Sequence, residues 1–134
     1  MIRFLDTDIC VAFLRGTSTG VRDRLLQYPK STIRLPAIVA AELYFGLEKS
    51  KSSRHQASAV QQFVGSFQIA SFDHNAAAQY GRVRALLESK GQPIGANDYL
   101  VAATVLAEKG ILVTGNVKEL KKVPGLKVEN WLAR

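Results

Sequence analysis

Short apolar runs alternate along this chain with longer stretches whose apolar residues recur at helical spacing. A strand that is followed by a helix pairs with the next strand in parallel, because the helix carries the chain back across the sheet. The alternation therefore predicts an α/β fold with a central parallel β-sheet flanked by helices and wound in both directions. The predicted strands are Ile2–Leu5, Thr32–Leu35, Phe67–Phe72, Ile111–Val113 and Leu126–Val128.

Residues that favour helix ends mark the predicted helices between these strands. Thr7 or Asp8 is expected to cap the first helix and Asp73 the longest one, since short polar side chains satisfy free backbone N–H groups. The 134 residues show no linker and no internal repeat, so we expect one domain over residues 1–134. The predicted helices cover residues 8–14, 21–28, 36–49, 54–65, 73–89, 96–110 and 117–121.

The charge balance favours a polyanionic partner. Eighteen Lys and Arg residues stand against eleven Asp and Glu residues, which leaves a formal net charge of +7. Such an excess suits contacts with phosphate groups, although a merely soluble basic protein would show the same balance. The single Cys10 excludes an internal disulfide and a Cys-rich zinc site, and its apolar neighbours predict a buried thiol. No signal peptide or membrane-length apolar run is present, so we expect a cytoplasmic protein.

Three carboxylates stand in apolar surroundings. Asp6 closes the first predicted strand, Glu42 lies inside an apolar helix, and Asp98 directly precedes the apolar run from Tyr99 to Ala107. An isolated charge in a buried element is costly unless it is paired or coordinated. Each also has an ordinary interpretation, because Asp6 and Asp98 could cap helices and Glu42 could face solvent. Other acidic residues, among them Glu119 and Glu129, have polar neighbours typical of surface charges.

The three carboxylates and one amide are expected to meet at one edge of the sheet. Asp6 follows the first strand and Asn116 follows the fourth, and the carboxyl ends of parallel strands lie together. Asp98 and Glu42 lie near the starts of helices that can face the same edge. An all-oxygen, anionic site of this kind suits Mg²⁺ or Mn²⁺. A basic protein with such a site has the charge plan of a nuclease that cleaves phosphodiester bonds through a metal-activated water.

Five segments resemble the PIN-domain ribonucleases, most closely the VapC toxins of VapBC toxin–antitoxin modules. They are Leu5–Ile9, Ala41–Leu43, Pro93–Asp98, Val113–Glu119 and Val123–Trp131, in this order along the chain. The resemblance extends from residue 2 to residue 131 and therefore covers nearly the whole chain.

The resemblance implies a homodimeric, Mg²⁺-dependent endoribonuclease toxin that a small VapB antitoxin neutralises. It implies Asp6, Glu42 and Asp98 as catalytic acids, with Asn116 as the fourth catalytic site position, and Asp6 and Asp98 as the main metal ligands. Asp8 departs from the family, which usually has Asn there. Position 116 is Asp in many PIN domains, and a neutral amide leaves one-metal and two-metal chemistry both open.

Two other functions remain open on sequence alone. The Asp6-Thr7-Asp8 segment after an apolar strand mimics the nucleophile motif of haloacid-dehalogenase-like phosphatases, although the chain is short for that fold. A non-catalytic domain that binds RNA or a partner protein could keep the same fold with a degenerate site. His55 and His74 stand at predicted surface positions, so a catalytic histidine pair is not expected.

Two further segments suggest partner surfaces. The helices at 37–49 and 54–65 carry more apolar residues than one sheet face needs, which predicts a dimer interface or an antitoxin groove beside the alternative of ordinary core. The candidates for contacts with the RNA backbone are Lys118, Lys121 and Lys122.

Overall fold

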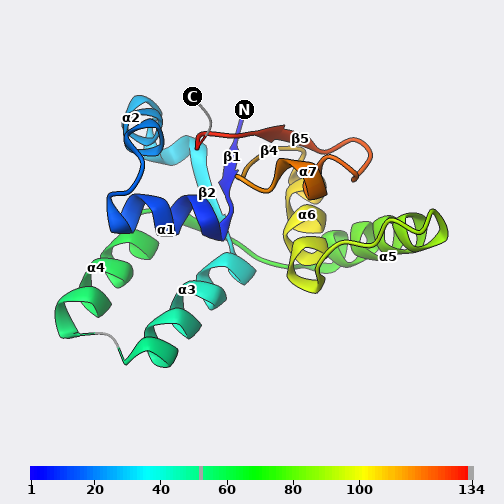
Figure 1. The fold of residues 1–134 in the computed structure, drawn as a ribbon. Coiled ribbons are helices and arrows are strands. Elements are labelled where there is room, and N and C mark those ends of the chain that lie inside the picture. The colour runs from blue at the N-terminus through cyan, green and yellow to red at the C-terminus, as the bar shows by residue number, and fades with distance from the viewer. Residues whose placement is uncertain (52, 133–134) are drawn as a thin grey trace.

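A computed structural model describes residues 1–51 and 53–132 and confirms a central parallel sheet (Figure 1). Its five strands lie in the order β3-β2-β1-β4-β5, and every neighbouring pair is parallel. Ser52, between the helices predicted over residues 36–49 and 54–65, and residues 133 and 134 of the predicted domain lie outside the described residues. The strands are β1 (Arg3–Leu5), β2 (Ile33–Pro36), β3 (Gln68–Ala70), β4 (Ile111–Val113) and β5 (Lys127–Glu129).

Side-chain caps set the starts of several helices. Ser18, Ser53 and Asp73 each accept a backbone N–H from the first turn of the helix that follows. The first helix starts at Thr7, and its cap is Asp6, which confirms the ordinary interpretation of Asp6 as a helix cap and not the prediction of Thr7 or Asp8. The helices are α1 (Thr7–Arg15), α2 (Thr19–Gln27), the 3₁₀ helix η1 (Lys30–Thr32), α3 (Ala37–Ser50), α4 (Arg54–Gly65), α5 (His74–Ser89), α6 (Ala96–Glu108) and α7 (Val117–Leu120).

The direction of winding reverses between β1 and β4. From β1 the chain moves to β2 and then to β3, whereas α5 and α6 carry it back across the sheet to β4 on the other side of β1. In Figure 1, α1 to α4 lie on one side of these central strands and α5 and α6 on the other. In open parallel sheets such a reversal leaves a crevice at the carboxyl ends of the strands, where ligands bind. Asp6 and Thr114 come directly after β1 and β4 and therefore stand at that crevice.

The strands supply the centre of one hydrophobic core. Phe4 and Leu5 of β1 and Leu112 of β4 are fully buried, as is Cys10 of α1. Burial raises the pKa of the Cys10 thiol, which is the inert, buried cysteine that its neighbours predict. Among the described residues, no helix is both long and apolar enough to cross a membrane.

Gly110, directly before β4, leaves no room for a side chain. An added Cβ would lie 2.3 Å from Phe4 Cε1 and 2.8 Å from the carbonyl oxygen of Ile2. Gly110→Ala is therefore expected to lower the free energy of unfolding by about 1–3 kcal/mol, because the Phe4 ring and the β1 backbone must shift. Gly81→Ala in α5 is the matched control, since its Cβ would meet nothing within 4 Å. Urea unfolding should show a gain of about 0.5–1 kcal/mol for this control; equal losses in both variants would contradict the steric explanation.

Candidate active site

Asp6 is held at the centre of the crevice by hydrogen bonds to both oxygens of its carboxylate. The backbone N–H of Thr7 donates to Oδ1 at 2.9 Å, and the hydroxyl of Thr114 donates to Oδ2 at 2.8 Å. The backbone N–H of Asp6 also donates to the carbonyl of Val113 at 2.9 Å, which fastens the end of β1 to the end of β4. Burial raises the pKa of Asp6 to about 6, even though the two donated hydrogen bonds act to lower it. Asp6 is thus a rigid, poorly hydrated carboxylate.

Glu42 joins this centre through Thr7. It lies on α3, and its Oε1 accepts a hydrogen bond from the Thr7 hydroxyl at 2.8 Å. Thr7 therefore contacts two carboxylates, donating its backbone N–H to Asp6 and its hydroxyl to Glu42. Glu42 is half-buried, so the alternative interpretation that it is a fully solvated surface charge is excluded.

Asp98 lies in the first turn of α6, and the charges of other acidic residues affect its pKa. Burial raises its pKa first, and the negative charges of Glu42, Glu119 and Asp8 raise it further. Gly95 caps this helix, and a Cβ added there would lie only 3.1 Å from Asp98 Oδ2. The absence of a side chain at Gly95 therefore leaves space directly beside the Asp98 carboxylate.

Asn116 stands at the edge of the site, and Asp8 lies closer in. Asn116 is exposed and its side chain makes no capping hydrogen bond with α7; its backbone N–H donates to the Thr114 hydroxyl at 3.0 Å. Asp8 Oδ2 instead accepts the backbone N–H of Gly115 at 2.8 Å. Its other oxygen, Oδ1, is buried and has no hydrogen-bond partner among the described residues. Asp8 is therefore bound to the loop after β4. From that loop the sequence predicted only the amide of Asn116 as part of the site.

The donor set fits a hard divalent cation. Its side chains offer oxygen alone, and the charges of Asp8 and Asp98 both raise the pKa of Asp6, as expected of carboxylates that repel one another without a cation between them. The unpaired Oδ1 of Asp8 is a further buried acceptor that lacks a donor. Among the described residues, no three His, Cys, Asp or Glu side chains already converge as a finished metal site. A cation would therefore have to draw these carboxylates together.

Asp8→Asn tests whether this carboxylate belongs to the site. The pKa of Asp8 is raised, chiefly by burial, so the fold disfavours its charge despite the position at a helix start. The variant is expected to stabilise the metal-free protein at pH 7, and to weaken Mn²⁺ binding about 10-fold. Chemical denaturation and calorimetry measure the two effects. A less stable variant with unchanged Mn²⁺ affinity would place Asp8 outside the site.

Two hydroxyl groups of the site carried no signal in the sequence analysis. Thr7 and Thr114 each donate to a site carboxylate, yet neither forms part of a pattern of charges. Only their place in the sequence could have indicated a role in the site: Thr114 directly follows β4, and Thr7 directly follows Asp6, which itself follows β1. Glu119, which looked like a surface charge, is half-buried and its charge acts on Asp98.

A sheet wound in both directions, with carboxylates at its point of reversal, matches a known family. The PIN domain model matches residues 3–126. The chain therefore belongs to the PIN domain family, whose nucleases are in general metal-dependent.

Its relatives narrow the membership to the VapC ribonucleases of VapBC toxin–antitoxin modules. Ribonuclease VapC2 of Rickettsia felis is 39% identical over 132 residues, which cover 98% of each chain. The tRNA(fMet)-specific endonuclease VapC of Salmonella typhimurium is 30% identical over 98% of this chain and 99% of its own. The crystal structure of VapBC2 from Rickettsia felis, bound to a promoter DNA fragment, has a TM-score of 0.91 over 98% of this chain and 99% of that one. These relatives favour neither the phosphatase nor the non-catalytic alternative.

Proposed function

We propose that this chain is the toxin of a VapBC module and cleaves RNA as a Mg²⁺-dependent endoribonuclease, with Mn²⁺ as a possible substitute. The observation that carries the proposal is Asp6, a buried carboxylate fixed by Thr7 and Thr114 at the point where the sheet reverses. A charge held in this way needs a cation, and a cation beside a basic protein surface suits a phosphodiester substrate.

Asp6, Glu42, Asp98 and Asn116 form the proposed catalytic site. Asp6 and Asp98 would hold the cation, which supplies Lewis-acid activation of water and of the scissile phosphate. Thr7 holds one oxygen of Glu42 and leaves the other available to accept a proton from the attacking water. Asn116, exposed at the rim of the site, is placed to contact the RNA or to complete the cation's surroundings through its amide oxygen.

A groove beside the site suits the proposed VapB-type antitoxin. It has a volume of about 490 Å³ and lies between α1, α3 and α4, with Thr7 and Glu42 among its lining residues. Its remaining walls include Val11 and Leu47, which are apolar side chains. An amphipathic segment could therefore bury apolar side chains there and extend a basic one toward Glu42. The matched structures include VapBC of Rickettsia felis and VapBC of Salmonella typhimurium, which supports an antitoxin as the partner.

A second copy of the chain is the other proposed partner. Tyr44 and Phe45 on α3 expose 45% and 64% of their surface, which is unusual for large neighbouring apolar residues. A homodimer that covers this face of α3 would remove that surface from water. Sedimentation of the purified chain tests this part of the proposal, with Phe45→Glu expected to shift any dimer toward monomer.

The cleavage experiment uses antitoxin-free protein with total cellular RNA and with initiator tRNA. The tRNA is included because a 30% identical relative is named a tRNA(fMet)-specific endonuclease. We expect discrete fragments with Mg²⁺ or Mn²⁺, none with EDTA, and none from Asp98→Asn. Fragments that persist in EDTA would contradict the metal-dependent mechanism. Metal binding without cleavage would indicate a narrower RNA substrate, and neither metal binding nor cleavage would favour a non-catalytic binding domain.

A further inference from the structure

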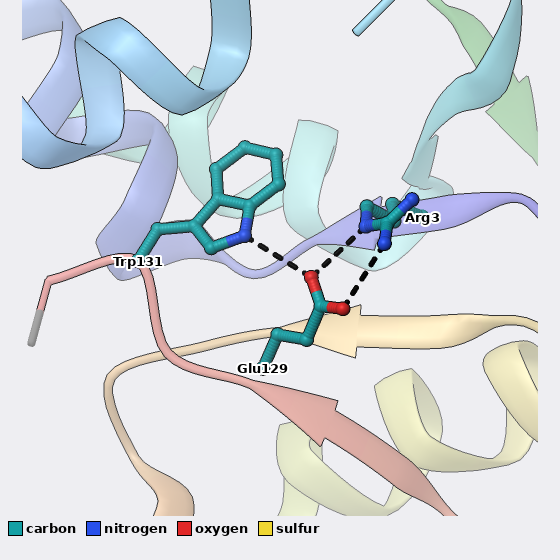
Figure 2. A network of polar contacts seen from close by, with 3 residues as sticks. All are labelled: Arg3, Glu129 and Trp131. Carbon is teal, nitrogen blue, oxygen red and sulfur yellow. Dashed lines mark hydrogen bonds and ion pairs between the residues drawn. The ribbon is translucent and has the colours of Figure 1, made fainter. Parts of the chain in front are cut away.

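Glu129, at the end of β5, receives side-chain hydrogen bonds from two residues that are distant from each other in the sequence. Arg3 of β1 donates from Nε to Oε1 at 2.9 Å and from Nη2 to Oε2 at 3.1 Å. The indole N–H of Trp131 donates to Oε1 at 3.2 Å. Figure 2 shows both donors converging on the one carboxylate. Because β4 lies between β1 and β5, the Arg3–Glu129 pair ties together two strands that are not neighbours.

Aromatic stacking also holds the two residues that donate to Glu129, Arg3 and Trp131. The Arg3 guanidinium lies 4.2 Å from the centre of the Tyr28 ring. Tyr28 in turn stacks on Trp131, with ring centres 5.6 Å apart and ring planes within 5° of parallel. Trp131 is only 1% exposed, although it lies close to the end of the chain. The hydrogen bonds between Arg3 and Glu129 lower the pKa of the Glu129 carboxyl and raise the pKa of the Arg3 guanidinium, so both side chains remain charged.

Glu129 is connected to the acidic site by two consecutive hydrogen bonds. Its backbone carbonyl accepts the N–H of Thr114 at 2.9 Å. The hydroxyl of the same Thr114 donates to Asp6 Oδ2 at 2.8 Å. The β-sheet register places Leu5, Val113 and Glu129 side by side, so Asp6 and Thr114 directly follow the residues paired in line with Glu129. The end of β5 therefore helps to hold the Thr114 backbone, whose side-chain hydroxyl contacts Asp6.

We propose that Glu129, clamped by Arg3 and Trp131, is a positioning residue that acts through Thr114 to hold Asp6 in its working orientation. The proposal rests on the proposed nuclease function. Glu129 touches neither the carboxylates of the site nor, by this assignment, the RNA. With the clamp released, the end of β5 can move, Thr114 loses its backbone anchor, and Asp6 loses the hydroxyl that fixes one of its oxygens. The consequence is a misplaced metal ligand in a folded protein.

The chain offers a matched control for the clamp. Arg34 and Glu108 form another bridging ion pair, with side-chain exposures of 26% and 30% against 18% and 30% for Arg3 and Glu129. Glu108 ends α6, whereas Asp98 lies in its first turn, so this pair stands at the far end of that helix from the site. Glu129→Gln and Glu108→Gln thus remove the same charge from similar ion pairs, and only the first is connected to Thr114.

Three measurements on both variants test the proposal: hydrogen exchange at the Thr114 amide, Mn²⁺ affinity by calorimetry, and kcat and KM on the cleaved RNA. Glu129→Gln is expected to lose Thr114 protection, to bind Mn²⁺ about 10-fold more weakly, and to lower kcat about 10–100-fold at unchanged KM. Glu108→Gln should match the wild type in all three measurements, with a comparable shift in melting temperature. Should Glu129→Gln fail to fold, Trp131→Phe removes the indole N–H and keeps an aromatic ring beside Tyr28. It also leaves a small cavity, because Trp131 is buried, and it should show the same loss of Thr114 protection more weakly.

The outcomes separate the clamp from the nuclease function. Unchanged Thr114 protection in Glu129→Gln overturns the clamp whether or not the protein cleaves RNA. Equal losses of kcat in Glu129→Gln and Glu108→Gln also overturn it, because the effect would then be general destabilisation. A wild-type protein that neither binds Mn²⁺ nor cleaves RNA would contradict the proposed function, while hydrogen exchange at the Thr114 amide would still decide the clamp.

Discussion

Asp6→Asn is expected to lower the rate of metal-dependent RNA cleavage by about 10²–10³-fold, the usual loss when one preorganised electrostatic group is removed from an active site. The amide has nearly the shape of the carboxylate and keeps one oxygen acceptor for Thr7 or Thr114. It lacks the negative charge that would hold a divalent cation. Because Asp6 is buried, solvent cannot supply a substitute ligand at that position. The loss should therefore appear in kcat, together with weaker Mn²⁺ binding in calorimetry.

Asp23→Asn is the matched control for this substitution. Asp23 lies on α2, its side chain is 63% exposed, and its ion pair with Arg22 at 3.5 Å is a surface contact. The same change of charge should leave both cleavage and Mn²⁺ affinity within about twofold of the wild type, since exposed pairs contribute little. Cleavage by Asp6→Asn at more than a tenth of the wild-type rate would remove Asp6 from the proposed catalytic set.

The order of strands and helices could be predicted because it depends on local patterns. Alternating apolar runs and a helix cap at Asp73 are properties of neighbouring residues, and the structure confirms the elements they predict. The boundaries were less accurate. The strand predicted over residues 67–72 is only Gln68–Ala70, because β3 is an edge strand that pairs with β2 over three residues. Of the cap candidates Asp6, Thr7 and Asp8, Asp6 caps the first helix because its backbone is extended just where β1 ends.

The site was predictable where a residue contradicted its surroundings. Asp6, Glu42 and Asp98 stand out as charges in apolar segments, and the structure places all three at least partly out of solvent. Threonine hydroxyls carry no such contrast, because Thr7 and Thr114 would be ordinary in any strand or helix. Their role depends on what the fold brings opposite them, and this holds also for Asp8 and its contact with the backbone of Gly115.

The contact between Glu129 and Arg3 could not be predicted from patterns among neighbouring residues. Glu129 has polar neighbours in the sequence and was interpreted as a surface charge, yet it is half-buried and bound by Arg3, 126 positions away. No periodicity or capping rule connects the two ends of a chain. Only the strand order, in which β1 and β5 flank β4, places these side chains within reach of each other.

The metal-free protein is expected to become less stable as the pH rises from 4 to 7, and Asp6 is the main cause. The pKa of Asp6 is about 6 in the folded protein, against the ordinary value of 3.8 expected in the unfolded chain. Below pH 3.8 the carboxyl is protonated in both states and burial is tolerated. Between pH 3.8 and 6 the unfolded chain gives up its proton first, which favours unfolding. Above pH 6 the full penalty is present, on the order of 3 kcal/mol.

Asp6→Asn isolates this contribution, because an amide does not titrate. The free energy of unfolding of the variant minus that of the wild type should be about 2 kcal/mol larger at pH 7 than at pH 4, because the unfolded carboxyl is already partly ionised at pH 4. Burial also raises the pKa values of Asp8 and Asp98, so they add an effect of the same sign to both proteins. The lowered pKa of Glu129 acts in the opposite direction, and it too is common to both. Urea unfolding at the two pH values in EDTA provides the comparison.

A divalent cation should reverse the destabilisation of the wild type at pH 7. A ligand that binds only the folded state stabilises it by about 2.7 kcal/mol when present at 100 times its dissociation constant. Added Mg²⁺ or Mn²⁺ is therefore expected to restore most of the free energy of unfolding that the wild type loses when Asp6 ionises. The Asp6→Asn variant binds the cation more weakly, so its free energy of unfolding should rise much less. If the cation stabilised both proteins equally, it would bind elsewhere. If the wild type lost no stability between pH 4 and 7 in EDTA, the carboxylate of Asp6 would be better solvated than its buried position indicates.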